Sequence, residues 1–507
     1  MRIHPVDLVI VVAYLLAVTT FGMRFRRGQR NTEDYFLGGR TAPWWALAFS
    51  IVATETSTLT IIGTPAISYA GNMAFLQLVF GYLLGRALIV VLLLPGYFRG
   101  EYFTAYALIE KRFGPQMRKV AAGIFLMTRA IAEGVRISAI ALVVSVVMGT
   151  SERAAVVVVV ALTVLYTWEG GMKAVIWTDV AQLTLYLAGS AATLFVLLDR
   201  IPGGWRELTQ VAAESGHKLQ VFDFSLHLAT KYTLWSGLIG GAFLTMATHG
   251  TDQTIVQRLL AARSENDGRR ALLTSGVIVL MQFTIFLLIG VALYVFARHT
   301  PLLAPGERAD RILPLFLVRE MPLGFAGLLL ASILAVAMSN ASGSLNSLAA
   351  SSVLDFSRRG VTANSHTGSP SRAALPSQDA SPGLLRKSRQ ATLVWGCVLM
   401  AFGFVKWGPL LETGLTVAAL PLGSLLGLFL LGTIDRRANS SGALAGMIAG
   451  LATILCVLRF TSVAFTWYVL IGSCTTFLVG ALCSRFAKNP SDRVRGKICS
   501  PDRLEAH

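Results

Sequence analysis

The chain has 507 residues, of which 54% are hydrophobic and only 14% are charged. Apolar stretches long enough to cross a bilayer recur along almost its whole length, which excludes a soluble globular protein. The net charge of +17 does not indicate nucleic-acid binding, because Lys and Arg lie mostly in short segments between the apolar stretches.

Hydropathy predicts an all-α membrane protein with about thirteen spans. The spans are expected at residues 5–23, 43–70, 73–95, 120–149, 154–170, 174–198, 232–257, 271–297, 323–352, 390–405, 410–433, 440–458 and 464–484. An odd number of spans places the termini on opposite sides, and Lys and Arg are concentrated in alternate loops. The positive-inside rule therefore predicts an outside N-terminus and a cytoplasmic C-terminus in the plasma (inner) membrane.

The span at 43–70 is interrupted by polar residues. Residues 50–63 read SIVATETSTLTIIG, with Glu55 between Thr54 and Thr56. A carboxylate at membrane depth costs about 2.5 kcal/mol or more unless it faces protein or water. A broken helix is tolerated there only where the freed backbone groups line a cavity or meet a buried partner. This stretch is predicted to form half of a binding site in a multi-span transporter.

Charged residues also lie inside other spans. Arg129, Glu133 and Arg136 share one face of the span at 120–149, which favours a structural ion cluster over a gate or a substrate contact. In YTWEGGMKAVIWTDVAQ, residues 166–182, two glycines predict a tight turn before Asp179 enters the next helix. This carboxylate is either stabilised by the helix dipole or serves as a cytoplasmic gate or ion-path ligand.

Two further spans carry polar clusters. The span at 232–257 has Thr245, Thr248 and His249 before a glycine, which favours a binding site over a buried core histidine. The span at 323–352 presents a small polar stripe that includes Ser339 and Asn340. Hydroxyl and carbonyl oxygens without thiol or imidazole suit a hard cation, and an alkali ion fits best. Packing of small residues between helices is the alternative for this stripe.

The two interrupted spans lie five spans apart and cross in opposite directions, which predicts a five-plus-five inverted repeat. The repeats are expected at 43–198 and 232–433, with the first helix in 1–23 and two C-terminal helices in 440–484 outside them. The loop at 357–389 is predicted to be disordered, and 485–507 to be a cytoplasmic tail. The five cysteines lack metal-ligand spacing, so neither a disulfide nor a zinc-type cluster is predicted. No catalytic constellation or cofactor motif indicates an enzyme.

Four segments together resemble the sodium/solute symporter family over roughly residues 5–485. They are DYFLGGRTAPWWALAFSIVATETSTLTIIGTP, YTWEGGMKAVIWTDVAQ, HGTDQTIVQR and AMSNASGSLNS. The resemblance implies the LeuT-type inverted-repeat fold, secondary active transport by alternating access, and sodium as the coupling ion. It also implies ion and solute sites. The implied sodium ligands are the backbone carbonyls of Ala53, Thr56 and Val336 and the side chains of Ser339 and Asn340.

The resemblance implies substrate contacts by Glu55, Thr60, Gln77, Thr245, Thr248 and His249. It implies ion coupling or release for Asp179. Family members often have Ala at 336 and Ser or Thr at 340, so Val336 and Asn340 depart from the family pattern. The aromatic pair of some sugar-transporting members is absent at 248–249, whereas Arg129 or His249 favours an anionic solute.

The expected function is sodium-coupled import of a small polar organic solute. The alternatives are a proton-coupled transporter of the same fold, using Glu55, Asp179 or His249, and a membrane solute sensor without transport. The expected partners are the solute, the sodium ion and the lipid bilayer, without nucleic acid. The sequence does not specify the solute, the ion stoichiometry or the oligomeric state.

Overall fold

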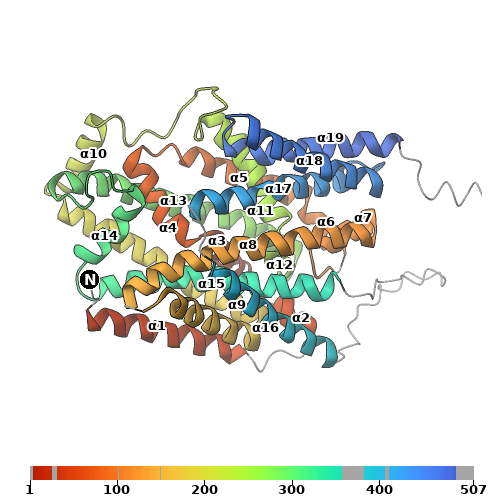
Figure 1. Ribbon diagram of the computed structural model, residues 1–507, viewed down its shortest axis with the longest axis horizontal. Helices are drawn as coiled ribbons and strands as arrows, with labels where there is room; N and C mark the ends of the chain where they lie inside the picture. Colours follow the sequence, from red (N-terminus) through yellow and green to blue (C-terminus); the bar gives the residue numbers. More distant parts are fainter. Residues whose placement is uncertain are drawn as a thin grey trace, which may run out of the picture.

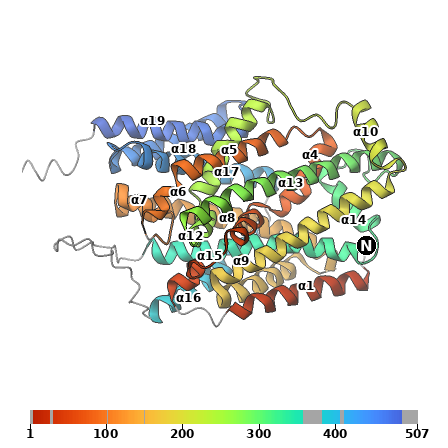
Figure 2. The same cartoon turned by 180° about the vertical axis from the view of Figure 1, so that it is seen from behind.

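The computed structural model describes residues 4–25, 31–100, 102–148, 150–356, 382–405 and 410–486. Helices running along the long axis form one bundle, in which α17, α18 and α19 lie on the side opposite α1 and α16 (Figures 1 and 2). The N-terminus lies at the same end as α10 and α14, and α19 finishes at the other end. The described chain therefore begins and ends at opposite ends of the bundle.

The helices have the following bounds: α1 (Pro5–Met23), α2 (Thr32–Leu37), α3 (Trp44–Glu55), α4 (Thr58–Ala70), α5 (Leu76–Leu92), α6 (Leu94–Phe98), α7 (Tyr106–Phe113), α8 (Pro115–Met148), α9 (Glu152–Arg200), α10 (Gly204–Glu214), α11 (Gly241–Gly250), α12 (Gln253–Leu260), α13 (Glu265–His299), α14 (Ile312–Arg319), α15 (Phe325–Leu354), α16 (Pro382–Gly403), α17 (Leu410–Ile434), α18 (Ser440–Phe460) and α19 (Tyr468–Phe486). Among the described residues, six helices are long and apolar enough to cross a membrane, or seven if α3 and α4 count as one span. The number thirteen stays a prediction.

The first predicted break lies between α3 and α4, which meet at a bend of 65°. Ser57 starts α4 with a capping box, in which its hydroxyl accepts from the Thr60 amide (3.2 Å) and its own amide donates to the Thr60 hydroxyl (3.3 Å). These bonds satisfy amides that the break would otherwise leave without partners. The polar residues predicted to interrupt the span thus form the start of a new helix.

The second predicted break separates α11 from α12. Thr251 leaves the helical conformation, and the Asp252 carboxylate accepts from the amide of Thr254 (2.7 Å) to start α12. Gly241, the first residue of α11, permits close packing on α5, since a Cβ there would lie 2.6 Å from the carbonyl oxygen of Leu78. Both interrupted helices expected from the sequence are confirmed.

Two predicted spans, 154–170 and 174–198, form the two arms of α9. Gly171 has a positive φ of 54°, a conformation that a residue with a side chain rarely adopts. Gly170 has no room for a side chain, because a Cβ there would lie 2.7 Å from the carbonyl oxygen of Gly22. The pair therefore marks the turn predicted between these spans.

The prediction of disorder over residues 357–389 is wrong for its last eight residues. Residues 382–389 form the first turns of α16, and residues 357–381 lie outside the described residues, as does the tail beyond 486. Leu385 packs against a cluster formed by Tyr35, Phe36, Ala349 and Ala350. This helical start depends on a distant apolar partner, which composition alone does not reveal.

Candidate functional site

Asp179 joins four helices at the centre of the bundle. One carboxylate oxygen accepts from the Ser50 hydroxyl of α3 (2.5 Å) and from Nη2 of Arg258 in α12 (2.9 Å). The other oxygen accepts from the Ser339 hydroxyl of α15 (2.7 Å). Asp179 and Arg258 are both fully buried. The role of Asp179 is therefore not explained by stabilisation through the helix dipole. Its carboxylate connects α9 to both broken helices and to α15.

The predicted sodium ligands are divided between two neighbouring sets of contacts. Nδ2 of Asn340 donates to the carbonyl oxygens of Thr56 (2.6 Å) and Val336 (3.0 Å). Its Oδ1 accepts from Nη1 of Arg136 (3.3 Å). The structure thus brings Thr56, Val336 and Asn340 together, while the Ser339 hydroxyl faces Asp179. Ala53 is fully buried on α3, one turn before the break.

Two residues that the sequence analysis missed hold the Thr56 side chain. Nε2 of Gln282 in α13 donates to the Thr56 hydroxyl (2.9 Å), and the Tyr186 hydroxyl of α9 donates to the same oxygen (3.1 Å). The Thr56 hydroxyl in turn donates to the carbonyl of Val52 (2.9 Å). The only available signal for Gln282 and Tyr186 was their polarity within apolar spans. Together they fix the end of α3 against α9 and α13.

Glu55 lies in a second buried cluster. It pairs with Arg86 of α5, and its Oε2 lies 3.3 Å from Nε2 of His249 in α11. The His249 Nε2 is also 3.2 Å from Nη2 of Arg86, and its Nδ1 is 2.9 Å from the Thr248 hydroxyl. Arg86, which the sequence analysis did not assign to the site, donates through Nε to the Ser275 hydroxyl (3.1 Å). Glu55 thus has a buried cationic partner, and the cluster links α3 to α11 through α5.

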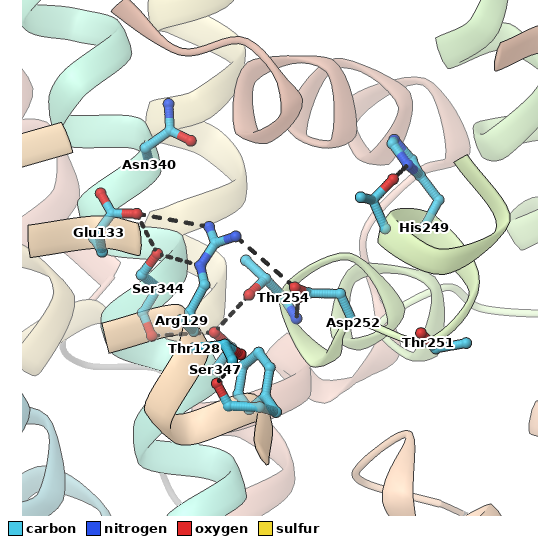
Figure 3. A network of polar contacts seen from close by, with 12 residues as sticks. Thr128, Arg129, Glu133, His249, Thr251, Asp252, Thr254, Asn340, Ser344 and Ser347 are labelled. Atoms are coloured by element: carbon cyan, nitrogen blue, oxygen red, sulfur yellow. Dashed lines mark hydrogen bonds and ion pairs between the residues drawn. The ribbon is translucent and has the colours of Figure 1, made fainter. Parts of the chain in front are cut away.

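The ionic residues of α8 extend beyond their own helix (Figure 3). Arg129 donates through Nε to the Ser344 hydroxyl (2.9 Å), and its other two nitrogens lie 3.8 Å from Glu133 and 3.9 Å from Asp252. The Ser344 hydroxyl donates to Glu133 (2.9 Å), and Arg136 also lies 3.4 Å from this carboxylate. The expected self-contained cluster therefore reaches α15 and the break between α11 and α12.

One nitrogen of Arg129 is incompletely satisfied. Its Nη2 is buried and has no hydrogen-bond partner among the described residues, and its ion-pair distance to Glu133 is too long for a hydrogen bond. A buried guanidinium nitrogen without a partner is unfavourable, and an added acceptor would stabilise it. In Figure 3, His249 lies apart from this network, on the other side of Asp252.

The remaining predicted substrate residues do not converge on one cavity. Gln77 donates to the carbonyl of Tyr232 (3.2 Å) and accepts from the amide of Asp223 (3.0 Å), so it ties the segment before α11 to α5. Thr60 is engaged in the capping box of α4, and Thr245 packs against Gly85 of α5. A small cavity with Tyr186 in its wall contains none of the predicted substrate residues.

Comparison with known proteins agrees with this architecture. Residues 35–450 match the model of the Sodium:solute symporter family. The chain is 28% identical over 500 residues to the sodium/sialic acid symporter SiaT of Proteus mirabilis (strain HI4320), with 95% of this chain and 96% of that protein covered. It is 30% identical to the human sodium/iodide cotransporter, with 85% of this chain and 66% of that protein covered.

The solved structures show the same fold. A Na⁺-coupled sialic acid symporter in a substrate-bound outward-open state superposes with a TM-score of 0.84 at 27% identity, covering 96% of this chain and 98% of that chain. Mhp1, a nucleobase-cation-symport-1 family transporter with bromovinylhydantoin bound, gives a TM-score of 0.59 at 16% identity, with 88% and 92% covered, and supports the fold alone. The LeuT-type architecture is thereby confirmed.

These matches exclude an enzyme and identify an integral membrane transporter that couples sodium to the import of a small organic solute. The two broken helices are typical of such transporters. The chain belongs to the sodium:solute symporter family.

Proposed function

We propose that the solute carries a carboxylate and that Arg129 binds it. The supporting observation is the buried Nη2 of Arg129, which lacks a hydrogen-bond partner among the described residues, while Nη1 of the same guanidinium lies 3.9 Å from Asp252 at the second break. A carboxylate offers the paired acceptor oxygens that a guanidinium binds best. Several relatives are named as transporters of anions, namely sialic acid, monocarboxylates and iodide. This proposal narrows the expected small polar solute to carboxylates.

The solute would bind between the two broken helices. Glu55 of α3 already lies close to His249, which contacts Thr248, and Thr245 precedes these two α11 residues by about one turn. Thr60 and Gln77 have other partners in this structure and would contact the solute only after those hydrogen bonds exchange. Among the proposed substrate residues, Glu55, Thr245, Thr248 and His249 therefore form an inner group. Thr60 and Gln77 lie outside it.

Sodium would bind between α3 and α15, at the carbonyls of Ala53, Thr56 and Val336 and the side chains of Ser339 and Asn340. Their contacts support this site, because the carbonyls of Thr56 and Val336 meet at the amide nitrogen of Asn340 and Ser339 adjoins a carboxylate. Asp179 would control ion release, since it joins α3 and α12 to α9 and α15. Separation of α3 and α12 from α9 and α15 would open a path for the ion on that side of the bundle.

The proposed orientation has the N-terminus outside and the C-terminus cytoplasmic in the plasma membrane. In this orientation α3 and α12, the halves that carry Ser50 and Arg258, face the cytoplasm. The bundle would rock to release both ligands inside, and the inside-negative potential adds about 2.3 kcal/mol per charge per 100 mV for sodium that crosses fully. Sodium would stabilise an outward-open state, and coupling requires that each ligand binds the closing-competent state better by about 1–3 kcal/mol.

A solute screen tests the carboxylate assignment. With sodium present, a carboxylate such as N-acetylneuraminate should raise the unfolding temperature of the purified protein, whereas its methyl ester should not. Arg129→Gln should reduce the affinity for this solute by about tenfold or more, because a charge-assisted hydrogen bond is lost. The matched control is Arg200→Gln, at an exposed position outside the cluster. Equal stabilisation by acid and ester, or unchanged affinity in Arg129→Gln, would contradict the proposal.

Ser339→Ala tests the sodium site. The hydroxyl is a proposed ligand and also bonds Asp179 (2.7 Å), so its loss should raise the sodium concentration for half-maximal uptake by about fivefold or more. Uptake into proteoliposomes at graded sodium concentrations measures this value. Ser332→Ala provides the control, because Ser332 is also buried on α15 but bonds the carbonyl of Leu328. An unchanged sodium dependence would remove Ser339 from the site.

A further inference from the structure

Asn340 fills the position between two facing carbonyl oxygens with an amide nitrogen. Nδ2 lies 2.6 Å from the carbonyl oxygen of Thr56 and 3.0 Å from that of Val336. An amide nitrogen carries two hydrogens, so it can donate one to each oxygen. Thr56 is the C-cap of α3, where the helix dipole adds negative character to the carbonyl. The amide thus supplies the partial positive charge that these oxygens require.

The orientation of this amide is fixed from both sides. Its Oδ1 accepts from Nη1 of Arg136 at 3.3 Å. A rotation by 180° would direct Oδ1 at two carbonyl oxygens and the NH₂ group at a guanidinium, so that both contacts would become repulsive. Asn340 is 2% exposed, so water does not compensate for a wrong orientation. In this structure the nitrogen therefore faces the carbonyls.

A sodium ion would reverse this preference. A cation next to the carbonyls of Thr56 and Val336 attracts the amide oxygen and repels the NH₂ group. The ion and the nitrogen cannot both be bound by the same oxygen pair at 2.6–3.0 Å. Binding therefore requires that the Asn340 amide turns or moves away, which also removes its contact with Arg136.

We propose that the Asn340 amide is an internal competitor of the coupling sodium ion, holding the Thr56 and Val336 carbonyls until sodium displaces it. This inference rests on the proposed sodium site at Ala53, Thr56, Val336 and Ser339, and it changes the role of Asn340 there from a ligand to a competitor. The competing group stabilises the sodium-free protein and raises the sodium concentration needed for binding. Its displacement frees Arg136, which also adjoins Glu133. Asn340 thereby connects ion binding to the ionic cluster of α8.

The test compares Asn340→Ser and Asn340→Ala with the original chain, using thermal unfolding of the purified protein during a sodium titration with choline as the replacement ion. Removal of the competitor should lower the half-saturating sodium concentration by about fivefold, which corresponds to one net hydrogen bond. The variants should unfold at lower temperature than the original chain without sodium. This difference should shrink at saturating sodium, because the amide bonds are absent from the ion-bound form.

Other results would overturn the inference. If Asn340 had only a structural role, its replacement would lower the unfolding temperature equally with and without sodium. If Asn340 were an oxygen ligand of the ion, the difference in unfolding temperature between variant and original chain would be larger with sodium than without it. Asn346→Ser is the matched control, since Asn346 is buried on the same helix but contacts Met172 instead of the two carbonyls. If Ser339→Ala and both Asn340 variants leave the sodium dependence unchanged, the sodium site itself is wrong. If Ser339→Ala and the Asn340 variants all weaken sodium binding, the sodium site stands and only the proposed competition by Asn340 is wrong.

Discussion

Replacing Asp179 by asparagine is expected to abolish sodium-coupled uptake and to lower the unfolding temperature markedly. The neutral amide would leave the fully buried Arg258 without its carboxylate partner. Breaking a buried ion pair by removing one partner costs about 3–5 kcal/mol. The substitution would also alter the contacts of Ser50 and Ser339, so that α3 and α15 lose their common partner. Uptake into proteoliposomes and thermal unfolding measure the two effects.

A second substitution separates the structural role of Asp179 from its role in transport. Asp179→Asn combined with Arg258→Gln removes both charges, so stability should largely return. If Asp179 controls ion release, uptake should stay absent in the double variant. Recovery of both properties would reduce Asp179 to an ion-pair partner. Asp310→Asn is the control, because Asp310 and its partner Arg308 are exposed and such pairs contribute about 0–1 kcal/mol.

Glu55→Gln is expected to have a comparable effect on stability. Arg86 is fully buried and has Glu55 as its carboxylate partner, so the substitution would leave a charged guanidinium in the protein interior. The expected loss is about 3–5 kcal/mol in the free energy of unfolding. Thermal or denaturant unfolding in detergent measures this loss.

The control for Glu55→Gln is Glu265→Gln, whose partner Arg269 lies one turn away on the same helix in an exposed pair. That substitution should change stability by no more than about 0.5 kcal/mol. Normal stability of Glu55→Gln with a complete loss of uptake would contradict the structural assignment. Such a result would favour direct contact of Glu55 with the ion, a proton or the solute.

The breaks in two membrane helices were predictable from the sequence because their causes are local. Ser57 and Asp252 each supply a side chain that caps the following helix, and each lies among polar residues in an apolar span. Gly171 similarly determines a turn through its own backbone conformation. Local preferences of this kind depend on neighbours within a few residues, so a single sequence contains them.

The partners of the buried charges were not predictable in the same way. Arg86 and Glu55 are 31 residues apart, and Arg258 and Asp179 are 79 residues apart. Which carboxylate reaches which guanidinium depends on helix rotation and packing, which hydropathy does not encode. For the same reason the sequence predicted that Arg129, Glu133 and Arg136 would satisfy one another, whereas the fold adds Ser344 and Asp252.

The sequence by itself determined that this protein crosses the membrane repeatedly and that two oppositely directed helices are broken, and it predicted an ion site near Thr56, Ser339 and Asn340. These features follow from hydropathy, local capping and recognisable segments. Only the tertiary structure decided the hydrogen bonds made by those residues. It directs Ser339 to Asp179 and the nitrogen of Asn340 to the Thr56 carbonyl, because donors and acceptors from distant helices must pair once water is excluded.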